Sequence, residues 1–227
     1  MHNRLLSALP IIARRRLERR LERVSLRLGQ LLHDQNEEMP YVYFPMSAMI
    51  SLQHVQQDGI RVEAATQGNE GIVGIAAVLG VRNAVGRAVT HVAGEAYRVS
   101  MRAFQDEIHR LPALFSLLGR YIHGLVQQIA LLNACNACHT VKQRYVRRLL
   151  TTHDVSPADD CVAPQQVLAD LIGVRRASIS IVAGDLQTAG LLHYHRGVVE
   201  ILNRRKLERL ACPCYRSIAE EKSRLWR

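Results

Sequence analysis

Two adjacent arginines, Arg175 and Arg176, begin a segment that has the residue types needed to contact DNA. A guanidinium can donate two hydrogen bonds to O6 and N7 of guanine, which discriminates between bases by roughly 1–3 kcal/mol. Apolar residues recur at helical spacing on both sides of the arginines, and Gly173 stands where the chain must turn. The two apolar stripes are Val167, Leu168, Leu171 and Ile172, then Ile179, Val182, Ala183 and Leu186.

Two short helices joined by a tight glycine turn share one small core and hold the second helix out for a DNA major groove. With its apolar stripe inward, the second helix turns Ala177, Ser180, Ile181 and Gly184 outward. Downstream, LLHYHRGVVEIL is typical of two strands that turn at Arg196-Gly197, which would form a wing. The sequence therefore predicts a winged helix-turn-helix and a DNA-binding function.

The cysteines offer a different chemistry. The stretch Cys135-Asn-Ala-Cys138-His139 has a Cys-x-x-Cys spacing that can bind zinc or cycle as a dithiol. However, the only other candidate pair, Cys212-Pro-Cys214, lacks a clear zinc-finger spacing, and Cys135 extends an apolar helical seam, where cysteine packs as a small hydrophobe. We therefore expect packing rather than a metal or redox role. With Cys161 the cysteines number five, and an odd number argues against a disulfide framework.

The N-terminal part of the chain shows two sequence patterns, one helical and one typical of strands. Residues 4–32 are predicted to be helical, since leucines recur there at helical spacing, interrupted by Pro10. Their arginines could form a nucleic-acid patch, but we favour a solvated helix face partly paired with Glu18 and Glu22. From residue 41 to 99 the chain reads as short strands separated by turns such as 57–59. The strands are YVYFP, MISLQHV, IRVEAAT, RAVTHV and EAYRVS, and their close spacing predicts a small barrel or jelly roll.

A long helix is predicted from Pro112 to about Ala134. One apolar row along it steps alternately by four and three residues, and this heptad pattern predicts a coiled-coil seam with a second copy of the chain. The row consists of Leu114, Leu118, Tyr121, Leu125, Gln128 and Leu132. The alternative is a helix that lies on its own barrel. We favour the dimer seam, because a second apolar face (Leu117, Val126 and Ile129) remains for the barrel.

Charge divides unevenly along the chain. Residues 1–139 hold 15 basic and 11 acidic side chains, whereas residues 140–227 hold 15 and 9, so the shorter C-terminal part is the more basic. This balance fits a domain that approaches phosphates. We predict a sensor barrel with N-terminal helices at 1–110, a dimerisation helix at 111–138, a winged helix-turn-helix at 139–210 and a tail at 211–227.

The chain resembles the Crp/Fnr family of transcription regulators, since the motifs YFP, GNEGIVG, VKQRYVRRLL, LIGVRRASIS and LQTAGLL match in sequence order. The resemblance implies an α+β fold with an N-terminal jelly-roll, cyclic-nucleotide-binding-like β-barrel, a long dimerisation helix and a C-terminal winged helix-turn-helix. It also implies a cytoplasmic homodimer that binds palindromic double-stranded DNA, with RNA polymerase as a further partner if the protein is an activator. No apolar run approaches the roughly 18 residues needed to span a membrane.

The resemblance also implies residue roles in DNA binding. Arg176 occupies the position that reads guanine in the family. Ala177 and Ile181 replace charged base-contacting residues, so thymine methyls are their expected targets and the operator half-site should differ from that of the best-known members. Ser180 shares the outward face. Contacts to the DNA backbone are implied for Gln166, Arg175 and Ser178, and for His195 and Arg196 at the wing tip.

Cofactor sites known from the family are incomplete here. Cyclic-nucleotide binders carry a Gly-Glu pair and, further on, Arg followed by Ser or Thr; the matching residues are Ile75, Arg87 and Ala88, so we expect no cyclic nucleotide. The iron–sulfur branch needs N-terminal cysteines, and none precedes Cys135. We expect no cofactor, no metal and no enzymatic activity. The competing interpretation is a redox- or ligand-sensing module that acts mainly through a protein partner, and the uncharged Ala177 and Ile181 favour it.

Overall fold

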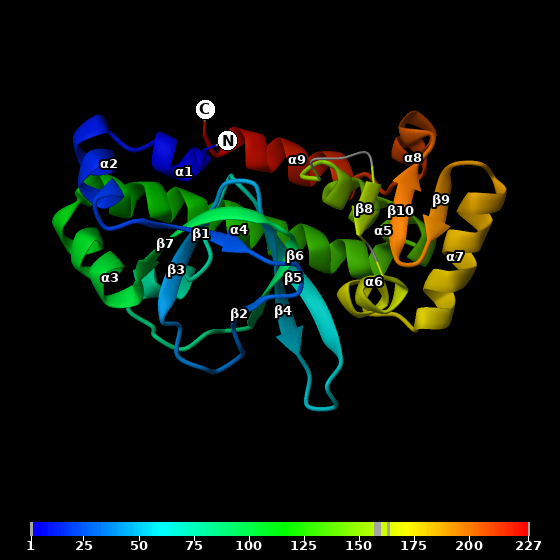
Figure 1. Ribbon diagram of the computed structural model, residues 1–227, viewed down its shortest axis with the longest axis horizontal. Helices are drawn as coiled ribbons and strands as arrows, with labels where there is room; N and C mark the ends of the chain where they lie inside the picture. Colours follow the sequence, from blue (N-terminus) through cyan, green and yellow to red (C-terminus); the bar gives the residue numbers. More distant parts are fainter. Residues whose placement is uncertain (1, 157–159, 163, 227) are drawn as a thin grey trace.

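The computed structural model describes residues 2–156, 160–162 and 164–226 and places a strand-rich N-terminal half beside a helical C-terminal half (Figure 1). The long helix α4 (Pro112–Cys138) runs along both. The N-terminal half contains α1 (Arg4–Ser7), α2 (Ile11–Glu18), β1 (Glu22–Leu26), β2 (Leu31–His33), β3 (Tyr41–Pro45), β4 (Met49–Val55), β5 (Arg61–Gln67), the 3₁₀ helix η1 (Ile75–Leu79), β6 (Arg87–Val92), β7 (Gly94–Ser100) and α3 (Met101–Arg110). The C-terminal half contains α5 (Val141–His153), β8 (Asp160–Val162), α6 (Gln165–Ile172), α7 (Arg176–Thr188), β9 (Leu192–His195), β10 (Val198–Ile201), α8 (Arg204–Leu210) and α9 (Cys214–Arg224).

The strands of the N-terminal half form two antiparallel sheets, in the orders β1-β7-β3 and β2-β6-β4-β5. The five strands expected from the sequence are all present, and β4 and β5 are joined through a turn in which Gly59 has a φ of +83°. Residues from both sheets, such as Phe44, Ile50 and Ala65, are fully buried. The predicted α+β fold is confirmed. None of the described helices combines the length and apolar character required to cross a membrane.

The N-terminal helical prediction is wrong beyond α2. Residues 22–26 form strand β1, which pairs with β7 in the register Glu22 with Arg98. The Arg98 Nε group donates to Glu22 Oε2 at 2.8 Å, so Glu22 pairs across the sheet rather than with the arginines of α2. Glu18 does pair with Arg14, at 3.5 Å. Residues with good helical propensity enter the strand here because cross-strand pairing outweighs that weak preference.

Helix α4 carries two apolar faces. The face predicted to meet a second copy of the chain is buried inside the molecule, and two of the three residues predicted to lie on the barrel are exposed. The residues of the predicted dimer seam are between 0% and 9% exposed, because they pack against the protein's own barrel and α9: Leu114, Leu118, Tyr121, Leu125, Gln128 and Leu132. The seam prediction for this face is therefore wrong. Phe115, Val126 and Ile129 are instead 56%, 59% and 41% exposed, whereas Leu117 is buried.

Residues 211–227, expected to be a tail, are largely helix α9, which lies along α4 (Figure 1). The Trp226 ring stacks on Tyr121 of α4 with centroids 6.5 Å apart. Lys222 forms an ion pair with the buried Glu70 of the barrel, with Nζ 2.5 Å from Oε1. The C-terminal segment therefore belongs to the core of the molecule and connects α4 to the barrel.

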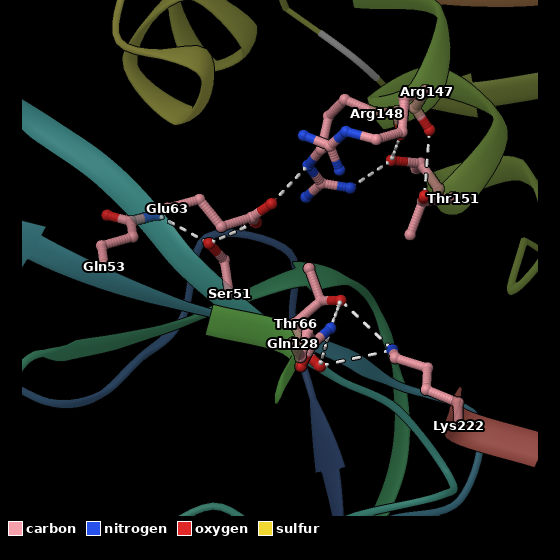
Figure 2. A network of polar contacts seen from close by, with 10 residues as sticks. Ser51, Gln53, Glu63, Thr66, Gln128, Arg147, Arg148, Thr151 and Lys222 are labelled. Atoms are coloured by element: carbon pink, nitrogen blue, oxygen red, sulfur yellow. Dashed lines mark hydrogen bonds and ion pairs between the residues drawn. The ribbon is translucent and has the colours of Figure 1, made fainter. Parts of the chain in front are cut away.

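A buried ion pair joins the helical half to the barrel (Figure 2). Arg148 of α5 places Nε 3.0 Å from Oε1 of Glu63 on β5, and the two side chains are 1% and 3% exposed. Ser51 donates to the other carboxylate oxygen of Glu63 at 2.7 Å, and Arg148 Nη1 donates to Thr152 at 2.8 Å. Removing one partner of such a pair leaves the other charge buried and uncompensated, which costs about 3–5 kcal/mol.

We predict that Arg148→Met lowers the free energy of unfolding by about 3–5 kcal/mol, since Glu63 loses its guanidinium partner. Adding Glu63→Gln to this variant should cost less than the sum of the two single changes. Urea denaturation followed by circular dichroism measures both effects. As a matched control, Arg23→Met breaks the exposed pair with Glu95 and should cost at most about 1 kcal/mol. Equal stability of Arg148→Met and the parent protein would contradict this role of the pair.

Candidate nucleic-acid interface

Helices α6 and α7 form the two-helix unit predicted from the sequence. Helix α6 ends at Gly173, whose φ of +70° and ψ of +46° place it in the left-handed region that favours glycine. The apolar stripes of both helices meet below this turn and pack on α5, and their most buried members are Leu168, Ile172, Ile179 and Leu186. This small core fixes the angle at which α7 stands out from the domain, at the edge of the molecule in Figure 1.

The outward face of α7 carries the predicted reading residues. Arg175 is the N-cap of the helix, Arg176 is its first residue, and both side chains are exposed. Ala177 and Ile181 are also exposed, the latter at 66%. This arrangement directs two guanidinium groups and a small apolar surface away from the protein at the helix N-terminus, which is the end that contacts base edges in helix-turn-helix docking.

Polar residues around α7 are held by neighbours within the domain. Ser180 donates to Gln165 Oε1 at 2.6 Å, and Gln165 N donates to the hydroxyl of Tyr194 at 3.1 Å. Ser178 is half-buried. Gln166 is exposed and donates to Asp170 Oδ1 at 2.7 Å. The structure thus brings the α7 residues and Gln166 onto adjoining surfaces, and it orients Gln166 through Asp170.

The hairpin of β9 and β10 is the predicted wing. His195 pairs with Val198, so Arg196 and Gly197 form a two-residue turn. Both have positive φ, +47° and +83°, as a type I′ turn requires. His195 and Arg196 are exposed at its tip. Strand β8 adds to the other side of β10, a pairing that the sequence analysis did not predict.

Asp170 also links the helix-turn-helix to the barrel. Arg61 of β5 places Nη2 2.5 Å from Asp170 Oδ2. A Cβ on Gly173 would lie 3.3 Å from Cγ2 of Val62, so the turn of the helix-turn-helix rests against the same strand. The sequence analysis did not predict this contact, because nothing in the sequence of β5 or of α6 indicates a contact with a segment about a hundred residues away. The helix-turn-helix unit therefore packs directly against the barrel.

The barrel contains a cavity of about 320 Å³, and of the residues matched above to a cyclic-nucleotide site Ile75 lines it. Its lining is mostly apolar and comes from β4, β5, η1, the loop before β6 and α4, and includes Leu52, Ala64, Ile75, Leu79 and Val85. His33 is one of its few polar members, and burial lowers the pKa of its imidazole to about 4, so the ring is neutral at physiological pH.

Arg87, which the sequence analysis matched to a phosphate-binding arginine, pairs with a carboxylate of this chain. Its Nε donates to Asp34 Oδ1 at 2.8 Å and its Nη2 to Asp34 Oδ2, which makes a bidentate pair. The hydrogen bonds from Arg87 lower the pKa of Asp34 to about 2, so the carboxylate stays ionised and paired across the physiological range. Arg87 is not among the residues that line the cavity.

The structure also assembles residues that the sequence analysis kept apart. Cys135 and His139 at the end of α4 lie beside Cys212 and Cys214, whereas Cys138 faces outward and is exposed. The predicted burial of Cys135 is confirmed. The Cys-x-x-Cys spacing therefore does not describe the group that forms, because Cys135 is buried within the group whereas Cys138 is exposed and outside it.

Comparisons agree with this geometry. A family described as "Crp-like helix-turn-helix domain" matches residues 143–210. Among solved structures, FixK2 from Bradyrhizobium japonicum is 16% identical and superposes with a TM-score of 0.70 over 85% of this chain and 98% of that chain. The c-di-GMP responsive global regulator CLP from Xanthomonas campestris is 18% identical, with a TM-score of 0.69 over 85% and 99%. A transcriptional regulator of the CRP family from Thermus thermophilus is 20% identical, with a TM-score of 0.64 over 84% and 96%. Among curated proteins, none matches.

Proposed function

We propose that this chain, which carries a Crp-like helix-turn-helix domain and has the fold of Crp/Fnr-family regulators, is a DNA-binding transcription regulator that acts as a homodimer. The observation that carries the proposal is the exposed N-terminus of α7, where Arg175 and Arg176 project from a helix-turn-helix flanked by a wing. Two such units related by a two-fold axis read a palindromic operator whose half-site centres lie about 34 Å apart.

The reading surface divides into base contacts and backbone contacts. Arg176 takes a guanine through its guanidinium, and Ala177 and Ile181 meet thymine methyls. Ser180 lies on the same face. Contacts to phosphates come from residues around this face and from the wing tip, and they set register rather than sequence: Gln166, Arg175, Ser178, His195 and Arg196.

The exposed row on α4 supports the dimer. It runs through Phe115, Gly119, Ile122, Val126 and Ile129, with steps of four, three, four and three residues. This is the heptad spacing of a coiled-coil seam. Phe115, Val126 and Ile129 are exposed and Ile122 is half-buried, and the last three of the row also line the barrel cavity. A second copy of α4 would bury these side chains from both protomers. The predicted dimer is kept, but on the opposite face of the helix.

The barrel senses a signal other than a cyclic nucleotide. A cyclic nucleotide needs acceptors for its ribose hydroxyls and a cation for its phosphate. Ile75 lines the cavity at the position matched to the ribose-binding carboxylate, and Arg87 forms an ion pair with Asp34. An apolar cavity with the neutral His33 suits an uncharged, largely apolar molecule instead. Its occupancy would bias the position of the helix-turn-helix through β5, which touches both.

The proposed function makes a first prediction, which concerns helix α7. Arg176→Ala should weaken binding to the selected operator by roughly 10- to 100-fold and relax preference at one base pair, because the lost contact is to a base. Random-sequence enrichment first supplies the operator, and fluorescence anisotropy then measures the affinity. Arg15→Ala, which removes the same charge from exposed α2 at the far end of the molecule, is the matched control and should change affinity little.

Two outcomes would count against these roles for α7. Enrichment that recovers no motif would favour the competing module that works through a protein partner. Enrichment that returns the half-site of the best-known family members would refute the roles given to Ala177 and Ile181.

The second prediction concerns the dimer. Val126→Asp should convert the dimer into monomers, because it places a charge in the centre of an apolar seam. Light scattering after size-exclusion chromatography measures the mass of the particle. Ser116→Asp introduces the same charge on an exposed position of α4 outside the row and should leave the dimer intact. A Val126→Asp protein that stays dimeric would show that the copies meet elsewhere.

The third prediction concerns the signal. Millimolar cyclic AMP or cyclic GMP should shift neither the thermal melting temperature nor the operator affinity, since the cavity lacks both polar groups that such a ligand requires. Isothermal titration calorimetry on the full chain provides the direct measurement. Saturable heat with a micromolar dissociation constant for either nucleotide would overturn the assignment.

A further inference from the structure

Four metal-binding side chains converge where α4 ends and α9 begins. Cys135 and His139 come from the last turn of α4 and its C-cap, and Cys212 and Cys214 come from the link between α8 and α9. Their ligand atoms all lie within 4.8 Å of one another. Two separations are shorter: the Sγ atoms of Cys135 and Cys212 are 3.4 Å apart, and Cys214 Sγ is 3.7 Å from His139 Nδ1.

These separations suit one tetrahedral zinc ion. Zinc binds thiolate sulfur at about 2.3 Å and imidazole nitrogen at about 2.0–2.1 Å, so tetrahedral ligand atoms lie about 3.6–3.8 Å from each other. The observed distances need shifts of only fractions of an ångström to about one ångström. A disulfide would instead hold its sulfurs about 2.05 Å apart, and the 3.4 Å between Cys135 and Cys212 is well beyond that bond.

The surroundings are also those of a structural metal site. Cys135, Cys212 and Cys214 are buried, and Leu132 and Ile218 pack against them. Three thiolates, a neutral imidazole and Zn²⁺ carry a net charge of about −1, which in a buried place needs a compensating cation.

That cation is present in Arg147 of α5. Its side chain is 5% exposed, and its positive charge acts on the thiols of Cys135, Cys212 and Cys214. Its Nε atom is buried and makes no hydrogen bond with any described residue. A guanidinium with an unused donor beside three thiols is placed to donate to a metal-bound sulfur.

We propose that Cys135, His139, Cys212 and Cys214 bind a structural Zn²⁺ ion. The set is a closed Cys₃His site with four protein ligands, which is the arrangement of structural rather than catalytic zinc. Soft thiolates with one imidazole select zinc over magnesium or calcium, and a single ion accounts for ligand atoms this close together. The ion would replace the packing role expected for Cys135 from the sequence.

The position of the site gives the ion a mechanical role. His139 caps α4, and the next residue, Thr140, begins α5 with a capping box that includes Gln143. The ion would therefore cross-link the joint between the long helix and the helix-turn-helix domain to the start of α9. It would restrict how the DNA-facing domain turns relative to α4. None of the four ligands belongs to the proposed reading surface, so zinc binding does not depend on DNA binding.

The experiment measures metal in the full chain, purified under reducing conditions without chelators. Inductively coupled plasma mass spectrometry should find about one zinc per chain in the parent protein. Cys135→Ser and Cys212→Ser should each lower this content at least about tenfold, because a three-ligand site holds the ion weakly. Cys138→Ser is the matched control, since it alters the exposed cysteine of the same helix turn and should retain the ion.

Two further measurements keep the test decisive if a serine variant fails to fold. His139→Cys should retain zinc, because a Cys₄ set is also a structural zinc site. Titration of the metal-free parent protein with Co²⁺ should produce thiolate-to-cobalt charge-transfer bands and the ligand-field bands of a tetrahedral centre. A parent protein that contains no zinc and takes up neither metal would overturn the proposal. So would loss of zinc in Cys138→Ser, or a metal-free protein with a disulfide between Cys135 and Cys212.

Discussion

Glu63 and Arg148 bring opposite charges together inside the molecule, and the placement of the helical C-terminal half depends on that pair. Because both side chains are almost fully buried, the loss of either partner would leave the other charge buried and uncompensated. The pair thus holds α5 against β5, and the Arg61–Asp170 contact places α6 on the same strand. Ala64, the next residue after Glu63, lines the barrel cavity. One strand therefore touches the cavity, the buried pair and the helix-turn-helix.

Helix α4 is the second organising element, since three parts of the molecule meet along it. Its inner face packs on the barrel and α9, and two polar side chains there are satisfied by the barrel. Tyr121 donates to the carbonyl of Ile72 at 3.1 Å, and Gln128 donates to Thr66 Oγ1 at 3.2 Å. A polar residue within an apolar row is tolerated here because its hydrogen-bonding groups find fixed partners. These bonds allow Tyr121 and Gln128 to lie on the inward face together with the leucines of the same row.

The end of α4 is held from several directions. The Thr140–Gln143 capping box defines where α5 begins, and α9 lies alongside with Trp226 stacked on Tyr121. The proposed zinc ion would add a third restraint at the same joint. With the α4–α5 junction held in this way, a change in the barrel would move the helix-turn-helix domain as a whole, because α4, α5 and α9 could not shift independently of one another.

Many of the local elements, including the two helices of the helix-turn-helix, follow from the amino-acid sequence alone. Segments rich in β-branched and aromatic residues between turns identified the five strands. The helical stripes around Gly173 identified α6 and α7, because such patterns depend on neighbours within a few residues. Four outcomes could be seen only in the folded molecule. They are the inward-facing row of α4, strand β1 at residues 22–26, and helix α9 near the C-terminus. The fourth is the meeting of Cys135 and His139 with Cys212 and Cys214. Each of those outcomes depends on contacts between residues far apart in the chain, and a periodic pattern shows only that a face is apolar, not what will cover it.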